Sequence, residues 1–124
     1  MTQEEKQLLF KDLCGRLPYG VQIFHNLSET PKTFNSGHLN QIGVYTIKPY
    51  LRPMSSMTEE DKKVVCSMNT ISDTELNERL NYQKMYVQNY TIETFDYFNE
   101  HHFDFRGLIE KGLALEATEG MYKI

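Results

Sequence analysis

The chain has 124 residues and a formal net charge of −4, with 40% hydrophobic and 24% charged residues. These values predict one globular domain over residues 1–124, long enough to bury a core without disulfides or structural metals. They exclude a membrane span, because no apolar run approaches about 18 residues. The polar opening MTQEEK excludes a secretory signal. A cytoplasmic location is therefore expected.

Charge and cysteine placement narrow the functional classes further. Residues 1–50 carry five basic against four acidic side chains, whereas residues 51–124 carry eight against thirteen. The acidic second half disfavours broad binding to a phosphate backbone. Cys14 and Cys66 are far apart in the sequence. This spacing predicts two half-buried thiols in a reducing compartment rather than a disulfide framework.

The first 25 residues predict a helix followed by a strand. Thr2 and Glu5 have the spacing of a capping box, which predicts a helix over about residues 3–14 that ends at Gly15. The apolar side of this helix consists of Leu9, Phe10, Leu13 and Leu17. Residues 21–25 alternate in the manner of a strand.

The next segment predicts a small sheet. Residues 41–48 (QIGVYTIK) are rich in β-branched and aromatic side chains and give the clearest strand prediction of the chain. Pro49 and Pro53 are expected to prevent regular pairing, which makes the intervening residues an extended connector. Residues 20–50 could then build a curled antiparallel sheet or a small SH3-like barrel.

Two helices are predicted in the middle of the chain. The first begins at Ser56 or Thr58, since both have capping-box spacing, and the second begins at Ser72, with Glu75 completing a box. The segment that follows, residues 81–90, is rich in tyrosine and contains valine. These residues favour a strand, and continuation of the preceding helix is the alternative.

A third helix is predicted after Thr91. The threonine is placed to cap it, and Tyr90 and Phe95 are spaced to form a hydrophobic staple. An apolar stripe at helical spacing consists of Ile92, Phe95, Phe98 and His102. This stripe predicts that the helix packs against a core.

The end of the chain predicts a turn and a strand. Asp104 is placed to cap a shorter helix, and Gly112 suits the left-handed position after its last turn. Residues 113–117 alternate in the manner of a short strand. The whole chain therefore predicts an α+β fold, with a small antiparallel sheet packed with N-terminal, middle and C-terminal helices.

Three blocks of the sequence resemble a known group of proteins: residues 12–21, 47–60 and 98–123. They are similar to small uncharacterised proteins of Bacteroides-type gut bacteria, often encoded in prophages or other mobile elements. The chain departs from that group at Gly15 and Thr118. The group has no established activity, so no catalytic residue is implied. The resemblance implies a cytoplasmic accessory protein of a phage or mobile element.

One cluster could hold a metal ion. His101, His102 and Asp104 supply suitable ligand types. Adjacent helical residues point about 100° apart, so the two histidines could share an ion only if the helix ended at His101. His25 or His38 would then have to complete the site. The alternative is that His102 finishes the apolar stripe and His101 is solvated. No catalytic residue and no cofactor are predicted.

A basic and aromatic surface for single-stranded nucleic acid is a second hypothesis. It would use three cations near three tyrosines: Arg16, Lys48 and Arg52 with Tyr19, Tyr45 and Tyr50. The alternative is that the aromatic rings belong to the core and the charges are solvated. The net acidity of the chain weakens the nucleic-acid hypothesis.

The third candidate is a tyrosine face. Tyr82, Tyr86 and Tyr90 are spaced by four, so they share one side of a strand or of a helix, together with Lys84 in a strand. Such a face suits recognition of a protein, and the alternative is that the rings cover neighbouring loops. The preferred function is thus a non-enzymatic interaction or regulatory module with a protein partner. A nucleic-acid-binding module is the second choice and a metal-dependent enzyme the third.

Overall fold

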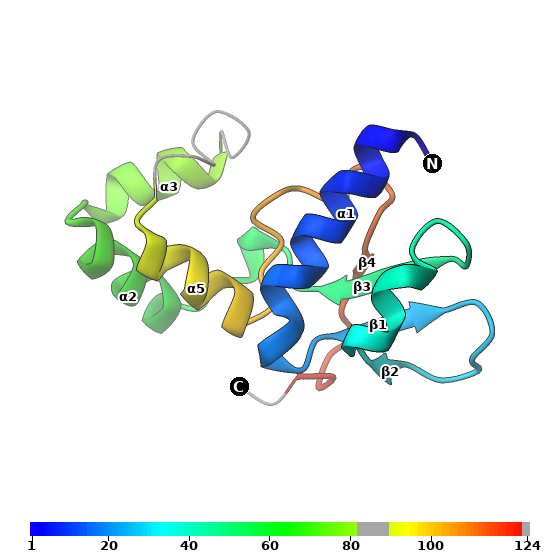
Figure 1. The fold of residues 1–124 in the computed structure, drawn as a ribbon. Helices are drawn as coiled ribbons and strands as arrows, with labels where there is room; N and C mark the ends of the chain where they lie inside the picture. Colours follow the sequence, from blue (N-terminus) through cyan, green and yellow to red (C-terminus); the bar gives the residue numbers. More distant parts are fainter. Residues whose placement is uncertain (82–89, 123–124) are drawn as a thin grey trace.

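A computed structural model describes residues 1–81 and 90–122 (Figure 1). The fold is α+β, as predicted, and combines a four-stranded sheet with helices α1 (Gln3–Arg16), α2 (Glu59–Asn69), α3 (Asp73–Asn81) and α5 (Ile92–Glu100). Figure 1 shows α2, α3 and α5 on one side of α1 and the strands on the other. Among the residues described, no helix has the length and apolar character needed to cross a membrane.

The sheet has the strand order β2-β1-β3-β4. Its strands are β1 (Gln22–His25), β2 (Lys32–Thr33), β3 (Ile47–Leu51) and β4 (Leu115–Glu116). β1 pairs antiparallel with both β2 and β3, whereas β4 joins β3 in parallel. The sheet is therefore mixed, and the prediction of a purely antiparallel sheet is wrong for β4. Within the described residues β2 and β4 are the two edges of an open row, so closure into an SH3-like barrel is not confirmed.

β3 lies later in the chain than predicted. Only the last two residues of the predicted strand 41–48 belong to it, and a 3-10 helix, η2 (Ser36–Gln41), lies just before. Pro49 is paired opposite Ile23 inside β3, although proline was expected to prevent pairing. The Asn26 amide donates to the Thr46 carbonyl at 3.1 Å. Hydrogen-bonded pairs alternate along an antiparallel ladder, so the nitrogen of Pro49 faces away from β1 and no bond to β1 is lost.

α1 begins as predicted and ends later. Thr2 and Glu5 form the capping box, with the Glu5 amide donating to the Thr2 hydroxyl at 3.1 Å. Gly15 does not end the helix, which continues to Arg16 and into a 3-10 turn, η1 (Leu17–Tyr19). A side chain on Gly15 would begin 3.4 Å from the Asn99 amide nitrogen. This is an ordinary contact distance, so Gly15 lies where α1 packs beside α5 and is tolerated inside the helix; the left-handed Gly20 (φ 70°) ends the segment.

The middle helices begin at two of the predicted caps. Thr58 and Asp61 form the capping box of α2, with reciprocal hydrogen bonds of 3.1 and 3.0 Å. Ser56 lies instead in a 3-10 turn, η3 (Met54–Ser56). The Ser72 hydroxyl accepts from the Glu75 amide at 3.2 Å at the start of α3. The segment after α3, for which either a strand or a continued helix was predicted, lies almost entirely outside the described residues.

Thr91 caps α5, as predicted, because its hydroxyl accepts from the Thr94 amide at 3.3 Å. The predicted staple forms, with the rings of Tyr90 and Phe95 edge to face at 6.1 Å. The stripe prediction is wrong at both ends. Ile92 is 80% exposed, and α5 stops at Glu100, so that His102 has a left-handed backbone (φ 63°). The chain has already left the helix at this histidine.

The short helix expected after Asp104 is not formed. The carboxylate does act as a cap, accepting from the amides of Leu108 and Ile109 at 2.7 and 2.9 Å. The residues that follow form turns rather than a helix. Gly112 is left-handed, as predicted, with φ 74°.

Replacing Gly112 by alanine is expected to lower the free energy of unfolding by about 1 kcal/mol. Open space surrounds the Cβ position, so the cost comes from backbone strain alone. Urea denaturation measures it. Gly112→Asn is the control, since asparagine tolerates this backbone region better and should cost less. Equal stability of wild type and Gly112→Ala would contradict the left-handed turn.

Two clusters of buried apolar side chains lie on the two sides of α1. The sheet core joins α1 to the strands and consists of Leu9, Leu13, Val21, Ile23, Phe34, Ile42, Ile47, Leu51, Leu108, Leu113 and Ala114. The helical core joins the other helices and consists of Met54, Met57, Val65, Leu76, Phe98, Phe103 and Phe105. α1 contributes buried leucines to the sheet core only.

Buried charges connect α1 to the C-terminal part of the chain. Asp12 and Arg16 are both fully buried, and the Asp12 carboxylate accepts from Arg16 Nε at 2.8 Å and from Arg106 Nη1 at 2.7 Å. Arg16 Nη2 also donates to the Phe103 carbonyl at 2.7 Å. This Asp12–Arg16–Arg106 cluster fixes the inner side of α1 and leaves its outer side exposed.

Candidate functional site

The predicted metal ligands point to different partners. The His101 ring lies on Tyr97 (4.2 Å between centroids), the His102 ring stacks on Tyr122 (3.8 Å), and Asp104 binds backbone amides. Among residues 1–81 and 90–122, no three His, Cys, Asp or Glu side chains are grouped to hold a metal ion. The three residues therefore do not converge on one site, and each contacts a different part of the fold.

Burial shifts the pKa of both His102 and Asp104. Burial lowers the pKa of His102 to about 4, aided by the positive charges of Arg16 and Arg52. Burial also raises the pKa of Asp104 above its ordinary value. His102 is 8% exposed and is neutral at physiological pH. Its partner Tyr122 donates to the Tyr50 carbonyl at 2.6 Å. His102 therefore supports the contact of the C-terminal segment with β3.

Most of the predicted tyrosine face lies outside the described residues. Tyr82, Lys84 and Tyr86 lie outside the described residues, and Tyr90 lies inside them. Tyr90 is half-buried and meets the ring of Phe98 edge to face at 5.2 Å. Burial raises the pKa of its hydroxyl. These contacts favour the alternative for Tyr90, in which the ring covers its own domain.

Two of the three cations of the predicted basic and aromatic surface are engaged within the domain, whereas Lys48 and Tyr45 line a hollow described below. Arg16 is fully buried beside Asp12. The Arg52 guanidinium lies over the Phe103 ring at 4.2 Å and donates to the His101 carbonyl at 3.2 Å. The prediction of a solvent-facing cation is therefore wrong for Arg16, and Arg52 is largely occupied by contacts within the domain.

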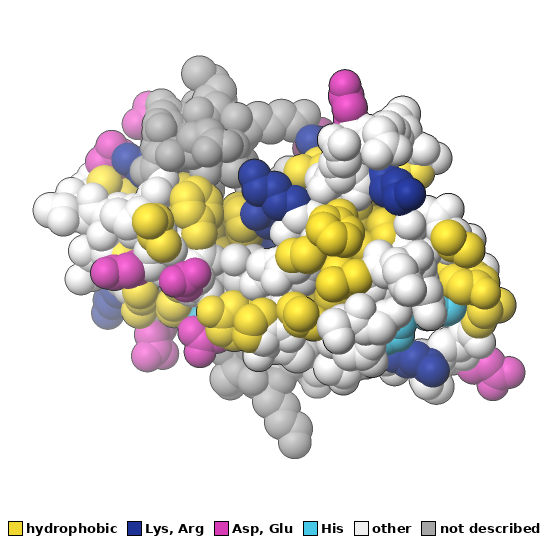
Figure 2. Space-filling view, in the orientation of Figure 1, with side chains coloured by type: hydrophobic (Ala, Val, Ile, Leu, Met, Phe, Trp, Pro, Cys, Tyr) yellow, Lys and Arg dark blue, Asp and Glu magenta, His cyan; other side chains and the backbone are white. Residues whose placement is uncertain are grey.

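A groove on the outer side of α1 is a better candidate. It is a hollow of about 310 Å³ between α1 and η2, lined by Gln3, Lys6, Gln7, Phe10, Leu39, Asn40 and Ile42. Phe10 was predicted on the apolar side of the helix with Leu9 and Leu13, but it is 45% exposed. It follows Leu9 by about 100° of rotation, which turns its ring away from the sheet core. Figure 2 shows hydrophobic side chains gathered over α1 and η2 on this face.

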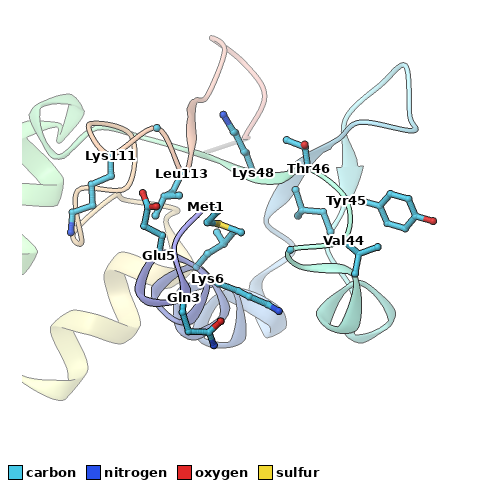
Figure 3. A pocket seen from close by; sticks show the side chains of 14 residues that line it. Met1, Gln3, Glu5, Lys6, Val44, Tyr45, Thr46, Lys48, Lys111 and Leu113 are labelled. Carbon is cyan, nitrogen blue, oxygen red and sulfur yellow. The ribbon is translucent and has the colours of Figure 1, made fainter.

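A second hollow adjoins the groove at the start of α1. Its volume is about 680 Å³, and it lies between the start of α1, residues 43–48 and residues 111–113. The charged side chains lining it are Glu5, Lys6, Lys48 and Lys111. Figure 3 shows the three lysine side chains pointing apart around the hollow. We call this region the basic hollow.

The groove and the basic hollow form one continuous face, because Gln3 and Lys6 line both. The stem of Lys6 lies against the backbone of Gly43, where a Cβ atom would be 2.9 Å from Lys6 Cε. The neighbouring Val44 is 72% exposed. We call this combined surface the α1 face. The position of Phe10, one residue after Leu9 and off the i, i+4 spacing of Leu9 and Leu13, could have indicated this face in the sequence.

The two cysteines differ in their surroundings. Cys14 is exposed rather than half-buried, which corrects the prediction, and Cys66 is partly buried as predicted. The Cys66 thiol lies 3.6 Å from an Asp73 carboxylate oxygen, and burial raises its pKa. A raised pKa disfavours the thiolate that nucleophilic chemistry requires.

A comparison with family models, curated proteins and solved structures found no match to the chain. The function of the α1 face must therefore be inferred from its own geometry and charge.

Proposed function

We propose that the chain is a non-enzymatic interaction module that binds a protein partner through the α1 face. The observation that carries the proposal is the apolar groove beside the exposed ring of Phe10. Large aromatic side chains are enriched at the centres of protein interfaces, where their burial contributes most of the binding energy. An apolar side chain of a partner would gain contact with Phe10, Leu39 and Ile42 together.

A protein partner fits this face better than the two alternatives. Single-stranded nucleic acid needs aromatic platforms interleaved with accessible cations, and Arg16 is buried while Arg52 is engaged with Phe103. A metal-dependent enzyme needs converging ligands, whereas His101 and His102 stack on separate rings. The groove needs neither property to bind an apolar side chain.

The resemblance of three sequence blocks to proteins of Bacteroides-type gut bacteria extends the proposal. We propose a cytoplasmic accessory protein of a phage or mobile element, whose role is to bind and regulate another protein. The resemblance alone supports this setting, and the α1 face supports the mode of binding.

The Phe10→Ser variant is expected to lose capture of the partner while remaining folded. Immobilised wild-type protein is exposed to a nuclease-treated extract of the cells that encode it, and bound proteins are quantified by mass spectrometry. Capture should fall at least about tenfold in the variant, as for an interface anchor. The free energy of unfolding should change by less than about 1 kcal/mol, because the ring is half exposed.

Ile92→Ser is the matched control. Ile92 is 80% exposed at the start of α5, outside the residues that line either hollow. This variant removes a comparable apolar side chain and should capture the partner as well as wild type does. The same set of proteins captured by all three forms would contradict the proposed groove. A specific interaction lost on nuclease treatment would favour nucleic acid instead.

A further inference from the structure

We propose that the segment bound by the α1 face is acidic and amphipathic, with apolar side chains in the groove and carboxylates over the basic hollow. This inference rests on the proposed function and specifies the chemistry of its partner. Its basis is the charge of the surface around the groove, which is opposite to that of the chain as a whole.

The charged side chains that line the α1 face are three lysines and one glutamate, whereas the whole chain has a net charge of −4. The glutamate, Glu5, is already engaged, because its carboxylate accepts from the Thr2 amide at 2.9 Å. This hydrogen bond lowers the pKa of Glu5, which keeps the carboxylate ionised in the capping box. The local field offered to a partner is positive because three lysines outnumber this one ionised glutamate.

Apart from an electrostatic interaction between Lys111 and Glu5, the described residues place no ion-pair partner beside the lysines of the basic hollow. Among the described residues, Lys6, Lys48 and Lys111 take part in none of the salt bridges, which involve other cations. Complementary charges of this kind contribute to orientation, specificity and association rate. They would fix the direction in which the partner segment lies on the groove.

The arrangement of the lysines determines the shape of the complementary anion. Figure 3 shows their side chains pointing apart around the rim rather than toward one point. A single small anion such as phosphate would need several donors converging on it. Carboxylates distributed along a peptide can instead meet the lysines one by one.

Lys6 connects the apolar and basic parts of the face. It is the charged residue that lines the groove, and it also lines the basic hollow. Its stem is positioned by contact with Gly43, so less side-chain freedom remains to be lost on binding. A partner segment with an acidic residue next to its apolar anchor would match this junction.

Selection from a display library of random peptides of about 16 residues tests the inference, since that length covers an interface segment. The purified full chain is the target, and peptides that also bind Phe10→Ser are removed. The enriched peptides should combine an apolar cluster with a net negative charge. Enrichment of neutral or basic peptides, or no enrichment, would overturn the acidic partner.

The role of the lysines is then measured with one enriched peptide. At low salt, Lys111→Glu should weaken its Kd at least about fivefold, and added salt should reduce the difference. Lys63→Glu, an exposed lysine on α2, makes the same change of charge elsewhere and should alter the Kd less than about twofold. Equal effects of the two variants would overturn the assignment of the basic hollow.

The same measurements separate this inference from the proposed function. Enrichment of neutral peptides that require Phe10 would support the groove as the binding site and would refute only the acidic character of the partner. If every peptide that binds wild type is lost in the removal step because it also binds Phe10→Ser, the groove itself is refuted. Single-stranded RNA or anionic vesicles that bind in a Phe10-dependent way, in the absence of enriched acidic peptides, would overturn both in favour of a different anion.

Discussion

Replacing Asp12 by alanine is expected to lower the free energy of unfolding by about 3–5 kcal/mol. The carboxylate receives hydrogen bonds from Arg16 and Arg106, at 2.8 and 2.7 Å for the shortest pair of each. Without it, the guanidinium of the fully buried Arg16 would remain charged in a medium that solvates it poorly. Urea denaturation monitored by circular dichroism measures the change.

Two controls define the origin of this effect. Glu75→Ala removes an ion pair with Arg79 of the same i, i+4 spacing, but its glutamate is exposed, so the loss should stay below about 1 kcal/mol. The double variant Asp12→Leu with Arg16→Met removes both buried charges and should recover part of the lost stability. If Asp12→Ala were as stable as wild type, this result would contradict the role of the buried ion pair.

This cluster explains how the same helix can be fixed on one side and available on the other. Arg16 reaches the Phe103 carbonyl, and Arg106 reaches Asp12 from the C-terminal part of the chain. α1 is thus attached by directional bonds as well as by its buried leucines. Phe10, on the outer side, contributes little to these contacts and is exposed. An apolar ring at this exposed position is therefore better explained by binding than by folding, and the low stability cost expected for Phe10→Ser follows.

Features set by neighbouring residues could be predicted from the sequence. The capping boxes at Thr2 and Thr58, the cap at Thr91 and the left-handed Gly112 all form. Each depends on groups within a few residues, such as a hydroxyl and an amide three positions apart. Tertiary packing does not have to be known to place them.

Features that depend on distant segments could not be predicted. β4 joins the sheet parallel to β3, a pairing between residues more than 60 apart in the sequence that no local pattern specifies. Pro49 is accepted in β3 because its nitrogen faces away from β1, and this depends on the register. Gly15 stays inside α1, where it lies beside Asn99 of α5.

The candidate site shows the same difference between features set by neighbouring residues and features set by distant segments. The histidine cluster was suggested by residues adjacent in sequence, but α5 ends at Glu100 and the left-handed backbone at His102 turns the two rings onto different partners. The α1 face instead combines α1, η2, the start of β3 with Lys48 and the turn that carries Lys111. Only the fold brings those segments together. In the sequence, the face could be indicated only by Phe10, which lies off the i, i+4 spacing of the buried leucines.

Lowering the pH from about 7.5 to about 5 is expected to destabilise the fold by roughly 2 kcal/mol through His102. Burial lowers the pKa of this histidine to about 4, whereas an unfolded histidine titrates near about 6.5. Between these values the unfolded chain binds a proton that the folded chain excludes. The stability is therefore fully present above the unfolded pKa and is lost as the pH falls toward the folded one.

The variant His102→Asn isolates this contribution from the titration of other groups. Asparagine tolerates the left-handed backbone at φ 63° and carries no titrating group in this range. The variant loses the stack on Tyr122 at every pH, so it should be less stable at pH values near 7.5, but its stability should fall less on acidification. The difference between the two proteins in urea denaturation should therefore shrink by roughly 2 kcal/mol toward about pH 5. A difference independent of pH would mean that His102 titrates alike in the folded and unfolded chains. It would contradict the burial of its ring between Tyr122 and the nearby Arg16 and Arg52, which disfavour a further positive charge.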